Sequence, residues 1–292
     1  MNKKKILVTG GAGFVGSNLI NFLLLKTKFN IISLDNYSSG SKKNHLKNKR
    51  VKYLAGETKD IKRIIRQPKN IHSVFHFGEF PRIYQSFLKM NECIQSNTIG
   101  TNSVFNFCLE NKIKLIYSAT SASLGNKGND KNLSPYAFTK SKNLELLENL
   151  KKWFNFQYEV IYFYNVYGPG QISSGNMATV IGIFEDAFKR NKPLPVVLPG
   201  SQSRRFTHID DTIKICYMAW KKSLSRHYSI SNKQSYSILQ VARMFGSKII
   251  YLKKRPGERY SSALTKMNLS NKVYRYFGKI KLKDYIKNII IK

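Results

Sequence analysis

A tyrosine and a lysine in the segment "SPYAFTKSK" are spaced so that they could act together on a proton. Tyr136 and Lys140 are four residues apart, and on a helix such a pair lies on one face. A phenol ordinarily has a pKa of ~10, and a cation beside it favours the phenolate form. A tyrosine held in this way is a general base near neutral pH. An exposed helix in a lysine-rich chain would contain the same spacing, so the pair needs support from the rest of the sequence.

The sequence around this pair alternates between short β-branched runs and helical segments. Strands are predicted over "KILVT", "NIISLD", "RVKYLA", "SVFHF", "KLIYSA" and "YEVIYFYNV". Helices are predicted over Phe14–Lys26, Asn97–Asn111 and Tyr136–Phe154. Strands that alternate with helices indicate βαβ units and a parallel sheet covered on both faces.

The regular alternation loosens beyond about Tyr167, where Gly168, Pro169 and Gly170 interrupt it. A chain of 292 residues is long for one domain. We therefore expect an α/β fold in which residues 1–166 form a Rossmann-type, doubly wound domain, to which 209–232 return. Residues 167–292 are expected to form a smaller substrate-binding domain.

A glycine-rich loop follows the first strand in "TGGAGFVGSNL". Gly10, Gly13 and Gly16 have GxxGxxG spacing, whereas Gly11, Gly13 and Gly16 satisfy GxGxxG, so spacing alone does not choose between them. Either set lets the backbone turn tightly and approach a pyrophosphate at the start of the next helix. Asp35 at the end of the second strand can accept the adenosine ribose hydroxyls and would repel a 2'-phosphate. NAD is therefore favoured over NADP.

Composition narrows the class of protein. The formal net charge of +34 is mostly lysine spread from Lys3 to Lys292, which indicates a composition bias and does not favour a nucleic-acid groove. The three cysteines are far apart and form neither a disulfide framework nor a zinc motif, so no metal is expected and a cytoplasmic location is the simplest. No apolar run is long enough to span a membrane. A non-catalytic protein that binds polyanions remains the alternative from another class.

Seven ordered motifs give the sequence a specific resemblance. They are "TGGAGFVG", "LDNYSSG", "VFHFG", "NTIGT", "YSATSASLG", "SPYAFTK" and "YNVYGPGQ". With them the chain resembles the extended short-chain dehydrogenase/reductase family, and within it the NAD-dependent nucleotide-sugar 4-epimerases of the UDP-glucose 4-epimerase type. The resemblance extends to "SRRFTHIDD" and "RPGE" in the second domain, and it implies a homodimer paired through the segment Asn97–Asn111 and the helix that carries Tyr136. Phe105, Phe107, Phe138 and Leu144 are candidate contacts, although burial within one subunit would explain them equally well.

The resemblance also implies catalytic roles. Thr120 would hydrogen-bond the reacting sugar oxygen, with Ser118, Ser121 and Ser123 as substitutes. Tyr136 would remove the proton, and Lys140 would hold the nicotinamide ribose. A hydride would pass to NAD and return to the other face of the keto sugar, which inverts C4 without net redox change.

Binding residues follow from the same motif frames. The cofactor positions are Gly10, Gly13, Phe14, Val15, Asp35, Asn36, Glu57, Thr58, Phe77, Gly78, Asn97, Tyr136 and Lys140. Glu57 stands where many relatives have Asp. The substrate positions, for a UDP-linked sugar, are Thr120, Asn165, Asn176, Val197, Arg204, Arg255 and Glu258.

Absent residues separate the sister reactions of the family. Thr120 is followed by Ser121 and Ala122, so the acid pair that a sugar 4,6-dehydratase uses is missing. An epimerase is favoured over a dehydratase, and an NAD(P)-dependent ketoreductase is the closer alternative. The sugar is not identified by the motifs. Arg82 could receive the carboxylate of a uronic acid, although simple exposure is the favoured interpretation.

Overall fold

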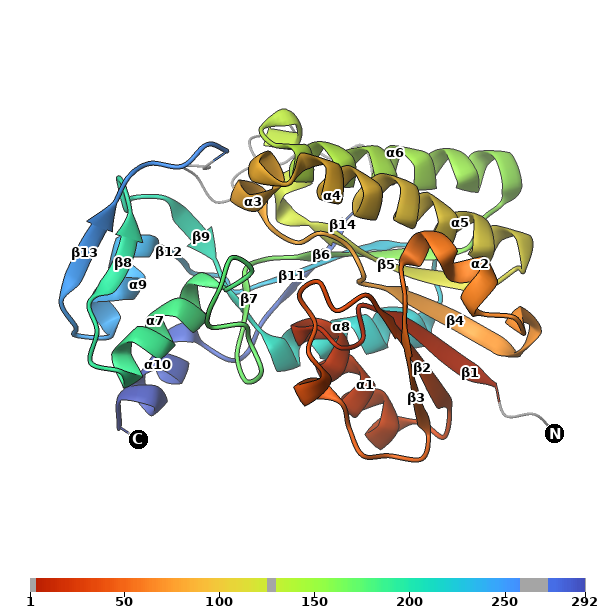
Figure 1. Ribbon diagram of the computed structural model, residues 1–292, viewed down its shortest axis with the longest axis horizontal. Coiled ribbons are helices and arrows are strands. Elements are labelled where there is room, and N and C mark those ends of the chain that lie inside the picture. Colours follow the sequence, from red (N-terminus) through yellow and green to blue (C-terminus); the bar gives the residue numbers. More distant parts are fainter. Residues whose placement is uncertain (1–3, 125–129, 258–272, 292) are drawn as a thin grey trace.

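Eight parallel strands form the central sheet of the computed structural model, which describes residues 4–124, 130–257 and 273–291 (Figure 1). Their order across the sheet is β14-β11-β6-β5-β4-β1-β2-β3. The strands are β1 (Lys5–Thr9), β2 (Asn30–Asp35), β3 (Val51–Ala55), β4 (Ile71–His76), β5 (Lys114–Thr120), β6 (Tyr158–Phe163), β11 (His227–Ser231) and β14 (Val273–Phe277). All neighbours pair in parallel. The predicted Rossmann-type α/β fold is confirmed.

Helices cover both faces of this sheet (Figure 1). One face carries α1 (Phe14–Lys26) and α8 (Ile209–Lys222). The other carries α2 (Ile61–Ile64), α3 (Ile83–Leu88), α4 (Met90–Ile94), α5 (Thr101–Glu110) and α6 (Pro135–Phe154). A separate apolar core fills each interface. The central strands are therefore apolar along their length, and β1 buries four of its five residues.

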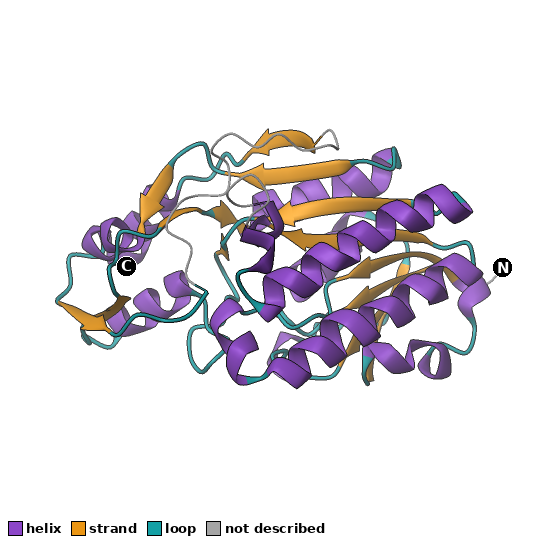
Figure 2. Ribbon diagram, turned by 90° about the horizontal axis from the view of Figure 1, so that it is seen from above, coloured by secondary structure: helices purple, strands orange, loops and turns teal. Residues whose placement is uncertain are grey.

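A smaller part stands beyond the carboxyl ends of the strands (Figure 2). Its elements are β7 (Val166–Tyr167), α7 (Val180–Lys189), β8 (Leu194–Val197), β9 (Ser203–Arg205), β10 (Thr207–His208), β12 (Ser235–Ser237), α9 (Ile238–Met244), β13 (Ile249–Leu252) and α10 (Leu282–Ile291). Three two-stranded pairs form within it, β7 with β10, β8 with β13, and β9 with β12. A third apolar core lies among α7, α9 and α10.

The division between the two parts differs in one place from the sequence prediction. Helix α8 and strand β11, within 209–232, lie in the large sheet layer as expected. Strand β14 also lies there, paired in parallel with β11, although its residues were assigned to the small domain. An edge strand of five residues meets only one neighbour, so its local sequence does not indicate which sheet it joins.

The chain reverses its direction of travel across the sheet between β1 and β4. From β1 it proceeds to β2 and β3 on one side, and later from β4 to β5 and β6 on the other. At such a switch point the loops after the two strands diverge, and a crevice opens at the carboxyl ends. A cavity of about 490 Å³ lies there, lined by both parts of the molecule.

Candidate active site

The loop after β1 forms one wall of this cavity. Gly10 has a φ of +69°, and a Cβ at this position would lie 2.8 Å from the backbone of Phe77 and Gly78. At Gly16 a Cβ would lie 2.1 Å from the carbonyl oxygen of Gly10. The Gly10, Gly13 and Gly16 set lines the cavity, whereas Gly11 packs against Ser33. The structure thus resolves the choice that spacing left open.

Helix α1 begins at Phe14 immediately after this loop. Its N-cap is Gly13, which offers no side-chain acceptor, so the first backbone N–H groups of the helix face the cavity with Phe14 and Val15. A helix start of this kind attracts an anion through its N–H groups and its dipole. The loop therefore suits a pyrophosphate.

Asp35 ends β2 at the far side of the glycine loop. Its carboxylate accepts hydrogen bonds from the backbone N–H of Ala12 at 2.9 Å and of Tyr37 at 2.8 Å. Burial raises the pKa of Asp35, and these N–H groups act in the opposite direction. Asn36 donates to Glu57, and both side chains line the cavity together with Asp35 and Thr58. The residues expected to hold the adenosine therefore line one cavity together, and their role in binding it stays a prediction.

Tyr136 reaches the cavity because α6 begins just before it. The Oγ of Ser134 caps the helix by accepting from the N–H of Ala137 at 3.1 Å, and Pro135 occupies the first turn. The N–H of Tyr136 donates to the Oγ of Ser86 at 3.2 Å, which ties α6 to α3. Tyr136 lines the cavity with Phe77 and Gly78.

Thr120 ends β5 and lines the same cavity. Its Oγ1 accepts from the N–H of Ala122 at 3.2 Å, and a hydroxyl that accepts one hydrogen bond can still donate its proton to a ligand. Ser118, Ser121 and Ser123 were the alternatives to Thr120. The hydroxyl of Ser118 donates to the carbonyl of His76, so its proton is already used in a hydrogen bond. Ser121 lines the cavity, and Ser123 is buried but is not one of the lining residues.

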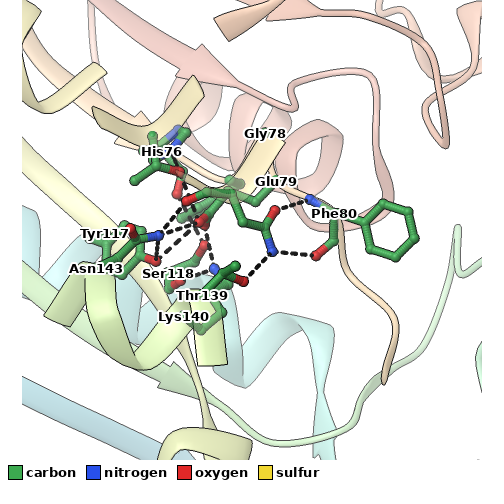
Figure 3. A network of polar contacts seen from close by, with 12 residues as sticks. His76, Gly78, Glu79, Phe80, Tyr117, Ser118, Thr139, Lys140 and Asn143 are labelled. Atoms are coloured by element: carbon green, nitrogen blue, oxygen red, sulfur yellow. Dashed lines mark hydrogen bonds and ion pairs between the residues drawn. The ribbon is translucent and has the colours of Figure 1, made fainter. Parts of the chain in front are cut away.

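Lys140 is not one of the residues that line the cavity. Its ammonium lies within a network of polar contacts around Glu79 (Figure 3). It donates to the carboxylate of Glu79 and to the carbonyl of Ser118, the latter at 2.5 Å. Tyr136 and Lys140 both lie on α6, four residues apart, and their pairing stays a prediction; the anion that contacts Lys140 is Glu79. The motifs did not point to this partner.

Residues of the smaller part close the cavity at the other end. Asn165, Val197, Arg204 and Arg255 line it, together with Pro195. Asn165 has a φ of +36° and donates to the carbonyl of Arg205 at 2.8 Å, which holds the two segments together. The guanidinium of Arg255 stacks over Tyr84 with 5.0 Å to the ring centroid. Two arginines thus face one cavity, as a diphosphate requires.

Besides Lys140, two predicted site residues do not line the cavity. Asn97 is fully buried in the π-helical segment Gln95–Gly100 that joins α4 to α5. Its side-chain amide accepts from the N–H of Phe80 at 2.6 Å and donates to that residue's carbonyl at 3.2 Å. These hydrogen bonds hold the backbone of Phe80 in place, and Asn97 itself does not line the cavity. Asn176 is exposed on a loop beside the cavity and lines only a shallow neighbouring hollow. Glu258 falls outside the described residues.

Arg82 is not simply exposed, so the favoured interpretation of this residue was wrong. It is half-buried in the cavity wall, and its Nε donates to the carbonyl of Met177 at 3.0 Å. Burial lowers the pKa of its guanidinium, while the phenol of Tyr136 acts in the opposite direction. The guanidinium of Arg82 is therefore a cation close to the phenol of Tyr136.

Several lining residues were not found from the sequence. Thr179 caps α7 by accepting from the N–H of Gly182 at 3.0 Å, and its position before an apolar periodic run was a signal for that helix start. Gln202 is buried, and its Oε1 is without a partner among the described residues. Its Nε2 donates to the carbonyl of Val197 at 3.1 Å. No local pattern distinguishes such a glutamine from a surface one.

The described ranges contain no group of side chains that could hold a metal ion. They also contain no helix with the length and hydropathy needed to cross a membrane. The homodimer implied by the resemblance stays a prediction, because the structure contains one chain.

Comparisons with known proteins agree with this geometry. The model of the NAD dependent epimerase/dehydratase family matches residues 6–231. A putative UDP-glucose 4-epimerase of Methanocaldococcus jannaschii is 27% identical, over 98% of this chain and 97% of its own. The UDP-glucose 4-epimerase of Thermotoga maritima, solved with UDP-glucose, superposes with a TM-score of 0.84 at 21% identity, over 98% of this chain and 97% of its own.

A third relative was solved with NAD bound. The UDP-glucuronic acid 4-epimerase of Bacillus cereus, solved with UDP-glucuronic acid and NAD, superposes with a TM-score of 0.84 at 23% identity, over 98% of each chain. At these identities the two solved structures show the shared fold. NAD is the cofactor, and the glycine cradle that a Cβ would fill, with Asp35 beside it, fits its pyrophosphate and adenosine ribose. The chain belongs to the NAD dependent epimerase/dehydratase family.

Proposed function

We propose that this protein epimerises a nucleotide sugar, a UDP-hexose, at C4 through a transient 4-keto intermediate. One observation carries the proposal: Thr120 and Tyr136 line the same cavity as the glycine loop at one end and Arg204 and Arg255 at the other. A dinucleotide and a sugar diphosphate would therefore meet at a hydroxyl and a phenol.

The residues divide the chemistry between them. The hydroxyl of Thr120 binds the oxygen at C4, and the phenol of Tyr136 removes its proton and later returns one. When bound, NAD would supply the acceptor and donor of the hydride at that carbon. Because the cavity is enclosed by both parts of the molecule, the keto sugar stays within reach of both groups while it turns.

Residues of the smaller part favour uridine diphosphate as the nucleotide of the substrate. Arg204 and Arg255 would bind the diphosphate, and the segment Pro195–Val197 would border the base. The unpartnered Oε1 of Gln202 is an acceptor buried beside Val197, and an acceptor there suits the ring N–H of uracil.

A dehydratase would need a carboxyl group free to act beside the catalytic hydroxyl. The described acids that line the cavity are Asp35, Glu57 and Glu79. Asp35 and Glu57 lie at the adenosine end, and Glu79 is paired with Lys140. The arrangement therefore favours epimerisation over loss of water.

Two further alternatives make different demands. A ketoreductase would use this same site but would consume reduced cofactor in each turnover. A protein that only binds polyanions would not need Thr120, Tyr136 and a cofactor cradle in one cavity. Retention on nucleic acid with a steep salt dependence would support the latter.

A homodimer paired through the segment Asn97–Asn111 and helix α6 also belongs to the proposal. Of the four candidate contacts, Phe105, Phe107 and Leu144 are buried within the subunit, and they are not available to a partner. Phe138 on α6 is exposed, as is Ile99 within the segment. Light scattering during size-exclusion chromatography tests this state, and Phe138→Lys should reduce the observed mass if this surface is the interface.

Incubation with UDP-glucose, UDP-N-acetylglucosamine and UDP-glucuronate, followed by chromatographic separation of epimers, tests the activity. The proposal expects one pair to interconvert without added reductant. Loss of water or stoichiometric oxidation of NADPH would indicate a sister reaction instead.

A further inference from the structure

A buried acid lies directly under the proposed catalytic residues, and the function given above does not use it. Glu79 follows β4, and its carboxylate forms an ion pair with Lys140 in which the two side chains are 2% and 5% exposed. Its Oε1 accepts from the hydroxyls of Tyr117 and Thr101, each at 3.0 Å, and from the amide of Asn143 at 3.3 Å (Figure 3). Strand β5 and helices α5 and α6 all contribute a donor.

Burying a carboxylate is costly unless its lone pairs are satisfied. Three neutral donors and one ammonium meet that requirement here. The network also fixes the ammonium, because Glu79 and the carbonyl of Ser118 each take one N–H of Lys140. Lys140 thus has two of its three N–H groups directed by the protein, and its position does not depend on a ligand.

A chain of hydrogen bonds supports Glu79 from behind. Burial lowers the pKa of His76 to about 4, so its ring is neutral at working pH. Its Nδ1 lies 2.7 Å from the hydroxyl of Thr9, and its Nε2 lies 2.9 Å from the hydroxyl of Thr101, which donates to Glu79. The N–H of Gly78 donates to Thr9 at 3.1 Å. The cofactor loop wall and Glu79 are therefore parts of one network.

We propose that Glu79 is a positioning residue for Lys140: it holds the ammonium in place for the cofactor and offsets its charge, which sets the pH range in which Tyr136 accepts a proton. This inference rests on the roles proposed for Tyr136 and Lys140. A carboxylate beside the ammonium weakens the positive potential that favours phenolate. The charged and titratable groups that face Glu79 or Tyr136 from the surrounding elements are His76, Arg82, Cys93, Tyr117 and Lys140.

The alternative is an ion pair that only stabilises the fold. Such a pair would alter thermal unfolding without altering either cofactor affinity or the pH dependence of turnover. The two roles therefore differ in measurable quantities.

The test compares Glu79→Gln, Lys140→Met and the double variant Glu79→Gln/Lys140→Met with the parent protein. NAD dissociation constants come from fluorescence titration, which needs no substrate, and pH–rate profiles come from the epimerase assay. Glu79→Gln should weaken NAD binding several-fold and move the midpoint of the acid limb to lower pH by about one unit. In the Lys140→Met background the same change should have no further effect on NAD affinity.

Glu92→Gln is the matched control, because Glu92 forms an exposed ion pair with Lys89 and lies outside the cavity. It should leave both readouts unchanged. Should Glu79→Gln not fold, Glu79→Asp keeps the charge and shortens the side chain, and it should weaken NAD binding while leaving the pH midpoint in place.

Unchanged NAD affinity and pH midpoint in Glu79→Gln, or an unchanged NAD affinity in Glu79→Asp, would overturn the inference. So would effects of Glu79→Gln and Lys140→Met on NAD affinity that simply add. Absence of epimerase activity in the parent protein would refute the proposed function alone, because the NAD titrations would still decide whether Glu79 acts through Lys140.

Discussion

The carboxylate of Asp35 accepts the backbone N–H of Ala12 at 2.9 Å, so the acid that ends β2 is fixed to the loop that follows β1. This places a negative charge beside the cradle expected to hold the cofactor's adenosine half. Asp35→Asn removes the charge but keeps an acceptor. We expect the preference for NAD over NADP to fall by about tenfold or more, because repulsion of the 2'-phosphate is lost. Fluorescence titration with both cofactors measures the ratio.

Asp60→Asn is the control for that experiment, since Asp60 forms an ion pair with Arg63 and is not among the residues that line the cavity. A parent protein that binds NADP more tightly than NAD would remove the role given to Asp35.

Tyr136→Phe should abolish turnover and leave NAD binding intact. Only the proton acceptor is lost, and general base catalysis contributes about 10²–10⁴-fold to a rate. The N–H of residue 136 that contacts Ser86 is unaffected by the change. Single-turnover kinetics and NAD titration measure the two effects separately. Full activity in the variant would show that another group takes the proton.

Lys140→Met should weaken NAD binding and destabilise the protein together. Glu79 would be left buried without its cation, which costs roughly 3–5 kcal/mol in the free energy of unfolding. Lys142→Met on the same helix breaks an exposed pair with Glu145 and should change stability by about 0.5 kcal/mol or less. Urea unfolding of both variants makes the comparison. Equal stabilities for the two would contradict the buried ion pair.

Gly16→Ala should prevent the cofactor loop from forming. Its new Cβ would lie 2.1 Å from the carbonyl oxygen of Gly10, a backbone atom that cannot move aside without displacing the loop. Gly246→Ala is the control, because that site has a φ of +68° but open space around it. The control should lose about 1 kcal/mol of stability and bind NAD normally. Normal NAD binding by Gly16→Ala would show that the loop is not the cradle.

Two buried histidines predict a loss of stability in acid. Burial lowers the pKa of both His76 and His227 to about 4, whereas an unfolded histidine titrates at about 6.5. The unfolded chain therefore binds more protons than the folded one between these values, and the free energy of unfolding falls as the pH drops. Between pH 6 and 5 the pair should cost about 2 kcal/mol, measured by urea unfolding. His227→Asn should roughly halve that dependence, and an unchanged slope would contradict it.

Local sequence signals were sufficient for the fold and for the choice of NAD as the cofactor. Short β-branched runs marked β1 to β6, and an apolar segment after the glycine loop marked α1, because the central strands and one side of this helix are buried. Glycine spacing and an acid at the end of β2 marked the cradle, because backbone geometry restricts those positions to few residue types.

Contacts between distant segments were not predictable in the same way. The partner of Lys140 is Glu79, sixty-one positions earlier, and no local pattern indicates that the two meet. Asn97 was predicted to bind the cofactor, but its side-chain amide forms hydrogen bonds with the backbone of Phe80. Arg82 looked like a surface charge in a basic chain and lies in the cavity wall. Each outcome depends on how α3, α4 and α6 pack, which one sequence does not specify.

The most direct measurement follows the hydrogen at C4. A UDP-hexose that carries deuterium at C4 is incubated with the enzyme in ordinary water, and the separated epimer is analysed by mass spectrometry and proton NMR. The account predicts that the product keeps its deuterium at C4 and that no cofactor is consumed. Deuterium found at another carbon, lost to water, or transferred to released cofactor would contradict it.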